Sequence, residues 1–172
     1  MLGLVVANQA GLTAIFVYLM AYLFMNLGAF YATMLIANKL NSDNIEDMKG
    51  LGYRSPAVCV FMAIFMFALS GVPATVGFIG KFYIFSALIE KHLVWLAVVG
   101  LLNSVVSLFF YVKVIKYMFL MKPDEGIDTK IQYSYGYYVM LLLFAFPTIF
   151  FGLYFTPFLR FAEASAVMFG LK

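Results

Sequence analysis

The chain has 172 residues, of which 65% are apolar and only 11% are charged, whereas a soluble domain carries about 25% charged residues. The composition therefore indicates a protein of the lipid bilayer. The net charge of +3 comes from 11 basic and 8 acidic residues that lie mostly between apolar runs. Because no basic stripe is present, the sequence does not predict a nucleic-acid-binding surface.

The first residues, 1–7, form an apolar stretch that is too short to cross a bilayer, which takes about 20 helical residues. The stretch also lacks the basic region with which a signal peptide begins. We interpret residues 1–7 as the end of a preceding helix whose beginning is missing.

The first long apolar run covers residues 11–38 and contains no charge. Its length exceeds the roughly 20 residues that a membrane-spanning helix needs, so it predicts a transmembrane helix. A charged loop follows at 39–56, and its Pro56 is well suited to the first turn of the next helix.

The second apolar run, residues 57–90, is too long for one straight crossing. As a continuous helix it would measure about 50 Å, and the hydrocarbon core is about 30 Å thick. The run contains four helix-weakening residues: Gly71, Pro73, Gly77 and Gly80. Each glycine costs about 1 kcal/mol in a helix interior and the proline about 3 kcal/mol. We therefore predict a break near 71–80 between half-helices at 57–70 and 80–90.

Lys81 follows this predicted break directly. A lysine at the centre of a membrane helix costs about 2.5–3.5 kcal/mol, and such residues usually face a bundle interior or cavity and mark ion or proton paths. An amine whose protonation responds to a partner's charge can take up and release a proton. We interpret Lys81 as a proton relay; the alternatives are that it extends to the interface or forms a fixed ion pair.

The third run, residues 93–121, carries two lysines on one face. Lys113 and Lys116 are three residues apart and lie within about two turns of the next loop, so they either reach toward the headgroups or belong to the proton path. The same run holds three polar residues, Asn103, Ser104 and Ser107. Such residues bond a neighbouring helix or line a hydrated path.

The last run, residues 135–159, predicts a transmembrane helix that Pro147 kinks, and the tail after it could form a short interfacial helix. If every run crosses the membrane, the loops 39–56 and 122–134 share one side. That side holds most of the basic residues, so the positive-inside rule predicts that it is cytoplasmic and that the C-terminus lies outside. The sequence has no cluster of His, Cys, Asp or Glu with the spacing of metal ligands.

The stretch "LSGVPATVGFIGKFYIFSALI" resembles the pattern L-[SA]-G-[IVF]-P-x-[TL]-x-G-F-x-G-K-x-Y of subunit N, the subunit 2 type, of proton-pumping NADH-quinone oxidoreductase, respiratory complex I. The flanking stretches "YLMAYLFMNLGAFYATMLI" and "LVWLAVVGLLNSVVSLFFYVKVIKYMFL" are similar to the helices on either side of that motif. The wider family includes the antiporter-like subunits of complex I and of multisubunit cation/proton antiporters.

The resemblance implies a fold, namely an all-α polytopic membrane helix bundle built from inverted repeats, each with a discontinuous helix and a buried charge. Residues 1–172 would form a single membrane domain that corresponds to the C-terminal part of the subunit, with one discontinuous helix. Lys81 matches the motif lysine, which belongs to the proton path, and Lys113 falls where relatives also carry a basic residue. Because the first repeat is absent, we expect a C-terminal fragment or a truncated gene model, whose missing N-terminal part completes the channel; the alternative is a split gene that supplies the rest.

The resemblance also implies a function. The chain would be a membrane-arm subunit that takes part in proton translocation coupled to electron transfer from NADH to quinone, in the bacterial inner membrane. Its partners would be the lipid bilayer and the other membrane-arm subunits. No cofactor is expected in this chain; FMN, iron–sulfur clusters and quinone belong to other subunits. The alternatives are a subunit of a multisubunit sodium/proton antiporter and, in another class, a membrane scaffold or assembly module that transports nothing.

Overall fold

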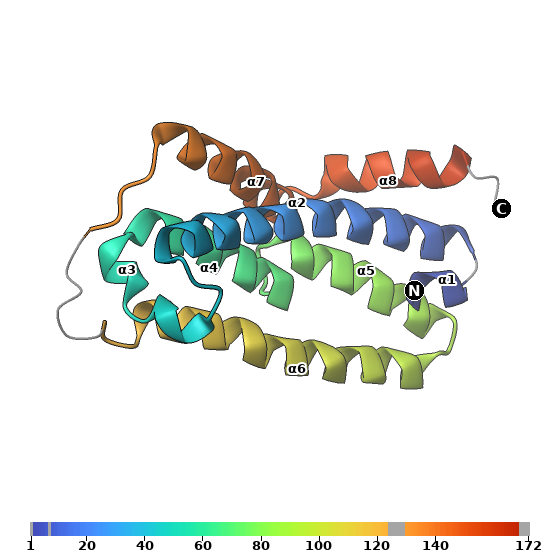
Figure 1. Cartoon of the computed structure of the whole chain (residues 1–172). Helices are drawn as coiled ribbons and strands as arrows, with labels where there is room; N and C mark the ends of the chain where they lie inside the picture. The colour runs from blue at the N-terminus through green and yellow to red at the C-terminus, as the bar shows by residue number, and fades with distance from the viewer. Residues whose placement is uncertain (1, 7, 124–129, 169–172) are drawn as a thin grey trace.

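The computed structural model describes residues 2–6, 8–123 and 130–168, and its regular elements are helices (Figure 1). In chain order they are α1 (Leu2–Val6), α2 (Gln9–Leu40), the 3₁₀ helix η1 (Ile45–Met48), α3 (Leu51–Arg54), α4 (Pro56–Ser70), α5 (Val76–Glu90), α6 (Val94–Phe119), α7 (Tyr135–Leu153) and α8 (Thr156–Met168). The predicted all-α membrane bundle is confirmed.

Three helices, α2, α6 and α7, are long and apolar enough to cross a membrane. In contrast, α4 and α5 have 15 residues each, or about 22 Å at 1.5 Å per residue. They follow one another along α2 (Figure 1). Together they cover a length that neither covers alone.

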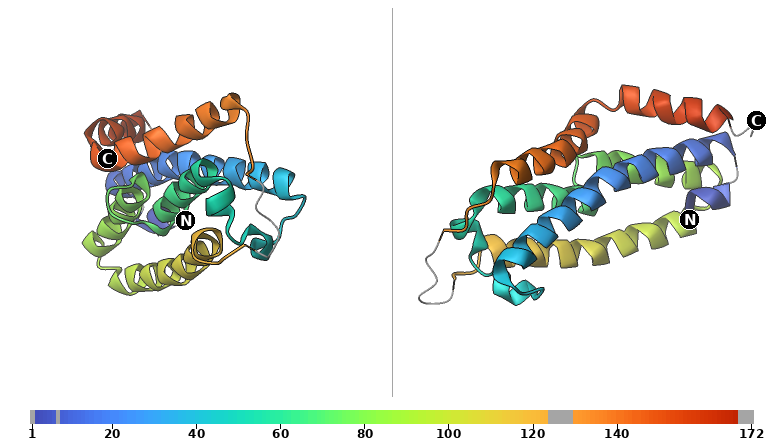
Figure 2. Two further views of the ribbon diagram at one scale, coloured as in Figure 1. Left: turned by 90° about the vertical axis from the view of Figure 1, so that its left-hand side faces the viewer. Right: turned by 45° about the horizontal axis from the view of Figure 1, so that its top comes forward.

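The central helix of the bundle is α2, which contacts α4, α5, α7 and α8. Small residues on α2 allow this close approach. A Cβ on Gly28, for example, would overlap the ring of Phe65 on α4. Figure 2 shows α7 and α8 on one side of α2 and α6 on the other side of the molecule. Only Ala97 and Met118 of α6 are buried, so this helix packs tightly near its two ends and loosely in between.

The interruption between α4 and α5 is shorter than the sequence predicts. It covers residues 71–75, and the second half-helix begins at Val76, so Gly77 and Gly80 lie inside α5. The prediction of a break extending to residue 80 is therefore wrong. A Cβ on Gly77 would overlap the carbonyl oxygen of Ala68, so this glycine permits close packing of the two half-helices. Because unpaired backbone groups in lipid cost several kcal/mol each, the helix continues through both glycines.

The helix predicted at 135–159 ends earlier, at Leu153. Tyr154 and Phe155 separate this helix from the next one, and Pro157 lies in the first turn of that next helix, where its missing amide hydrogen costs no intrahelical hydrogen bond. The chain forms α8 instead, which runs alongside α2 (Figure 1). Pro147 lies inside α7. Residues 1, 7 and 169–172 lie outside the described residues, and the interpretation of 1–7 as the end of a preceding helix stays a prediction.

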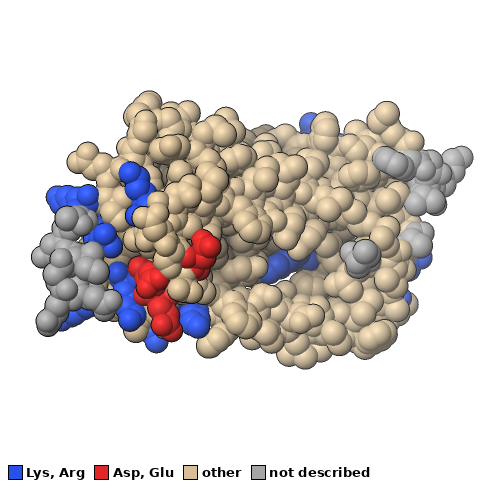
Figure 3. All heavy atoms as spheres, in the orientation of Figure 1, with Lys and Arg blue, Asp and Glu red and all other residues tan. Residues whose placement is uncertain are grey.

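The two charged loops lie at one end of the bundle. The amide of Gly50 donates to the carbonyl of Tyr117 at 3.1 Å, and the amide of Ile131 donates to the carbonyl of Arg54 at 3.0 Å. Figure 3 shows most of the visible charged side chains at that end. Residues 124–129 of the predicted loop 122–134 lie outside the described residues.

Candidate ion-translocation site

The interruption between α4 and α5 has a backbone that requires glycine at its first position. Gly71 has φ +87° and its amide donates to the carbonyls of Phe67 and Ala68. This left-handed glycine is a common way for a helix to end. Ala74 also has a positive φ of 71°, which is unfavourable for a residue with a Cβ. The break thus stores strain next to the predicted relay residue.

Lys81 reaches back from α5 to the end of α4. Its Nζ donates hydrogen bonds to the carbonyl oxygens of Leu69, at 3.0 Å, and Ser70, at 2.9 Å. These carbonyls belong to the last turn of α4, where a helix leaves its acceptors without intrahelical partners and its dipole favours a positive charge. The break therefore supplies both the acceptors and the field that hold an ammonium group in an apolar bundle.

Three cavities, of about 380, 400 and 280 Å³, meet at Lys81 between α2, α5 and α6. Ser104 lines all three of them, and Asn103 and Tyr18 each line two. Figure 3 shows Lys or Arg atoms at the bottom of a hollow in the middle of the molecule. Polar groups of two neighbouring helices thus surround the space that the lysine faces.

The polar residues of α6 contribute to these cavities. The hydroxyl of Ser104 donates to the carbonyl of Gly100 at 3.1 Å, and that of Ser107 donates to the carbonyl of Asn103 at 3.0 Å. Since each hydroxyl proton is bound within the helix, the serine oxygens keep lone pairs that can accept hydrogen bonds from water. The structure shows that Asn103, Ser104 and Ser107 line cavities, and the hydrated path that the sequence offered as one of their roles stays a prediction.

Sequence reasoning missed the tyrosines of this site. Tyr18 and Tyr22 on α2 stack with their ring centroids 5.8 Å apart, and both line the 400 Å³ cavity together with Tyr111 of α6. The available signal was the spacing of four residues between Tyr18 and Tyr22, which puts two hydroxyl-bearing rings on one helix face. Tyr111 lies far away in sequence, so only the packing of α6 brings it there.

Lys113 and Lys116 lie elsewhere. Both side chains are exposed, the Nζ of Lys113 lies 5.9 Å from the centre of the Tyr117 ring, and neither residue lines a cavity that contains Lys81. Lys113 is nine residues beyond Ser104, or about 14 Å along the helix. The structure does not bring them to Lys81, and their place in a proton path stays a prediction.

Other ionisable groups near the charged loops do not form a second site of this kind. The buried hydroxyl of Tyr133 has no hydrogen-bond partner among the described residues, and burial raises the pKa of Tyr133 to about 12. It therefore stays protonated at neutral pH. Within the described part of the chain, no group of three or more His, Cys, Asp or Glu side chains could hold a metal ion.

A broken helix in an apolar bundle, with a lysine bonded to the end of its first half and cavities around that lysine, is typical of membrane proteins that translocate ions. Residues 1–107 match the family model described as NADH:quinone oxidoreductase/Mrp antiporter, TM. The chain belongs to this family of integral membrane proteins.

Relatives over the whole chain carry one printed name, with small variations. NADH-quinone oxidoreductase subunit N 2 of Chloroherpeton thalassium is 44% identical over 99% of this chain and 34% of its own length. NADH-quinone oxidoreductase subunit N of Anaeromyxobacter is 37% identical over 98% of this chain and 34% of its own. NADH-quinone oxidoreductase subunit N of Chlorobium chlorochromatii is 39% identical over 100% of this chain and 34% of its own length. The similarity to subunit N is confirmed, and the chain spans about a third of the length of these curated relatives.

Proposed function

We propose that the chain is a membrane-arm part of a multisubunit NADH-quinone oxidoreductase and takes part in proton translocation coupled to electron transfer from NADH to quinone. The observation that carries this proposal is the position of Lys81, bonded to the end of α4 and facing three cavities. The names of the relatives support the choice of complex. Its partners are then the other membrane-arm subunits.

The mechanism of the proposed relay follows from the two environments of Lys81. The charged amine is held by the carbonyls of Leu69 and Ser70. A change in charge on a neighbouring part of the complex alters the electrostatic potential at Lys81 and hence its affinity for a proton. The amine then gives its proton to water in the adjoining cavities and later takes another. The flavin mononucleotide, the iron–sulfur clusters and the quinone act in other subunits.

The orientation belongs to the same proposal. The end that carries loops 39–56 and 122–134 faces the cytoplasm of a bacterium, and the far end of α8 faces outward across the inner membrane. The excess of Lys and Arg in those loops supports this orientation.

Sodium/proton antiport is the second candidate, because the matching family model also covers Mrp antiporters. The same lysine would then serve exchange with a different ion. A scaffold that transports nothing is the candidate of another class. It requires no function for Lys81, which makes Lys81 the residue that separates these candidates.

The test is Lys81→Met in the intact complex, reconstituted in sealed vesicles, with Lys49→Met of the charged loop as the matched control. We expect Lys81→Met to lose most of the proton translocation per NADH oxidised while the complex still assembles, and Lys49→Met to translocate normally. Normal translocation by an assembled Lys81→Met complex would favour the scaffold. Sodium transport that an imposed proton gradient drives without NADH, and that a protonophore abolishes, would favour the antiporter.

A further inference from the structure

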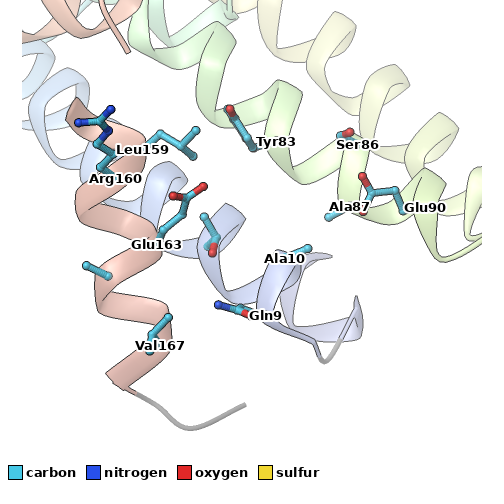
Figure 4. Close-up of a pocket in the computed structure, with 12 residues that line it drawn as sticks. Gln9, Ala10, Tyr83, Ser86, Ala87, Glu90, Leu159, Arg160, Glu163 and Val167 are labelled. Carbon is cyan, nitrogen blue, oxygen red and sulfur yellow. The ribbon is translucent and has the colours of Figure 1, made fainter. Parts of the chain in front are cut away.

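A further cavity, of about 630 Å³, lies between the first turns of α2, the second half of α5, and α8 (Figure 4). It is at the end of the bundle away from α3 and the charged loops (Figure 1). Its volume falls in the range of about 300–1,000 Å³ that is typical of small-molecule sites. The α8 wall lies beyond residues 1–107, which the family model matches, so the features that define the family do not explain this cavity.

The cavity is lined by charged side chains of both signs: Glu90, Arg160 and Glu163. None of the three forms an ion pair with another residue that the structure describes. Figure 4 shows Glu163 directed from α8 into the space between α8 and α5. The cavity therefore offers one guanidinium to an anionic group and two carboxylates to a cationic group.

These charges are ordered by depth along the bundle. Helix α8 begins at Thr156 and runs toward the end of the bundle (Figure 1), so Arg160 lies about 4.5 Å deeper along the helix than Glu163. Glu90 is the last residue of α5, and Gln9, the first residue of α2, also lines the cavity. Both therefore lie at the rim. An anionic group would bind deeper in the membrane than a cationic group.

The cavity lies at the depth of lipid headgroups. Helix α2 has 32 residues, or about 48 Å, and the hydrocarbon core is about 30 Å thick. With α2 centred in the bilayer, about 9 Å at each end lies among the headgroups. Glu163 is about 7.5 Å from the end of α8 at Met168, and Arg160 is about 12 Å from it. The cavity thus crosses the boundary between headgroups and hydrocarbon.

We propose that this cavity binds the headgroup of phosphatidylethanolamine, with the phosphate on Arg160 and the primary ammonium on Glu163 and Glu90. In such a lipid the phosphate is next to the glycerol and its acyl chains, and the ammonium is farther out, which is the order of the charges in the cavity. A guanidinium binds a phosphate with two parallel hydrogen bonds, and a carboxylate accepts hydrogen bonds from an ammonium. The acyl chains leave at the deep end, beside Leu159.

The lining also selects among phospholipids. Its excess of one negative charge disfavours a headgroup that has a phosphate and no cation, such as that of phosphatidylglycerol. The quaternary ammonium of phosphatidylcholine has no N–H to donate, and such groups are typically held by aromatic cages. Among the lining residues that the structure describes, Tyr83 alone is aromatic. The lipid site goes beyond the proposed function and requires no role for Lys81.

The test is photolabelling of the intact complex in phosphatidylcholine bilayers. The probe is phosphatidylethanolamine with a diazirine at the top of one acyl chain, and the matched phosphatidylcholine and phosphatidylglycerol probes are the controls. Mass spectrometry of peptides from this chain locates the label.

We expect the phosphatidylethanolamine probe to label α8 at least about tenfold more than either control probe, because one charge-assisted hydrogen bond contributes more than a tenfold change in affinity requires. An excess of unlabelled phosphatidylethanolamine should compete, and soluble phosphoethanolamine should not. Equal competition by phosphoethanolamine would contradict a lipid site.

Variants test the assigned residues in the assembled complex. Arg160→Gln and Glu163→Gln should each lower the labelling about tenfold, for the same energetic reason. Lys91→Gln is the matched control, because Lys91 is an exposed charge at the same end that does not line the cavity. The double variant Arg160→Glu, Glu163→Arg keeps the net charge and reverses the order of the charges. It should also lose the labelling, and labelling at the normal level would contradict the assigned order.

The comparison among probes needs no variant, so it decides the matter even if a variant fails to assemble. Equal labelling of α8 by all three probes, or no labelling of α8 by any, would contradict the headgroup site. The two proposals fail separately. Lys81→Met should be labelled like the unaltered complex, so normal translocation in Lys81→Met contradicts the relay alone, and unselective labelling contradicts the lipid site alone.

Discussion

Lys81 combines two properties that oppose each other in a membrane, a charge and a central position. The cost of about 2.5–3.5 kcal/mol for such a lysine is offset by two charge-assisted hydrogen bonds, each of which contributes about 1.5–3 kcal/mol, to Leu69 and Ser70. Because gain and cost are of similar size, a modest change in the surrounding potential is enough to shift the balance. A residue in this position is suited to change its protonation, whereas a tightly paired one is not.

Gly71 provides a test of this arrangement at the scale of one residue. We expect Gly71→Ala to lower the free energy of unfolding by about 1–2 kcal/mol, since its φ of +87° places a Cβ against the next carbonyl. The added Cβ would also lie 3.0 Å from Cδ of Lys81. Thermal denaturation of the purified complex, followed through this subunit, measures the loss.

Gly136 is the matched control for that substitution, because nothing lies within 4 Å of a Cβ built there. Gly136→Ala should leave the denaturation temperature unchanged or raise it slightly, as alanine favours the helix. Equal effects of Gly71→Ala and Gly136→Ala would show that the left-handed conformation at the break contributes nothing.

At the scale of elements, the α4–α5 pair depends on contact between the half-helices as well as on their interruption. The existence of the interruption was predictable, because a predominantly apolar run of 34 residues is longer than the bilayer is thick and contains glycines and a proline. Its length was not. Whether a glycine ends a helix or permits close packing depends on what lies opposite, and the carbonyl of Ala68 lies opposite Gly77.

Gly77→Ala should therefore disturb the site without touching Lys81. The new methyl group overlaps the backbone of α4, so the half-helices must separate, at a cost of about 1–3 kcal/mol, as for other overpacked cores. Separation weakens the hydrogen bonds of Lys81 to α4, and proton translocation per NADH should fall together with thermal stability. A stable Gly77→Ala complex with normal translocation would show that this contact is not needed.

At the scale of the whole molecule, two hydrogen bonds place both charged loops at one end: Ile131 of the second loop donates to Arg54 of the first, and Gly50 of the first donates to Tyr117 at the end of α6. We expect Lys49→Cys and Lys130→Cys to react with an impermeant thiol reagent from the same side of sealed membranes, and Arg160→Cys, on α8, from the other. The basic residues of the loops favour the cytoplasm for the first side. Labelling of Lys49→Cys and Lys130→Cys from opposite sides would contradict this arrangement.

The sequence by itself determined the membrane class, the long apolar helices, the presence of a break and the position of a lysine close to it. These features depend on the local length and composition of the apolar runs, which can be read along one dimension. The tertiary structure decided which polar groups share a space. Tyr18, Tyr111 and Ser104 lie on different turns of two helices, and they meet around Lys81 only because α2 and α6 have particular rotations about their axes. The cavity that Glu163 lines likewise depends on the non-helical residues between α7 and α8, after which α8 runs along α2. Such relations between faces are set by packing among all the helices, since a uniformly apolar run does not mark the face that points inward.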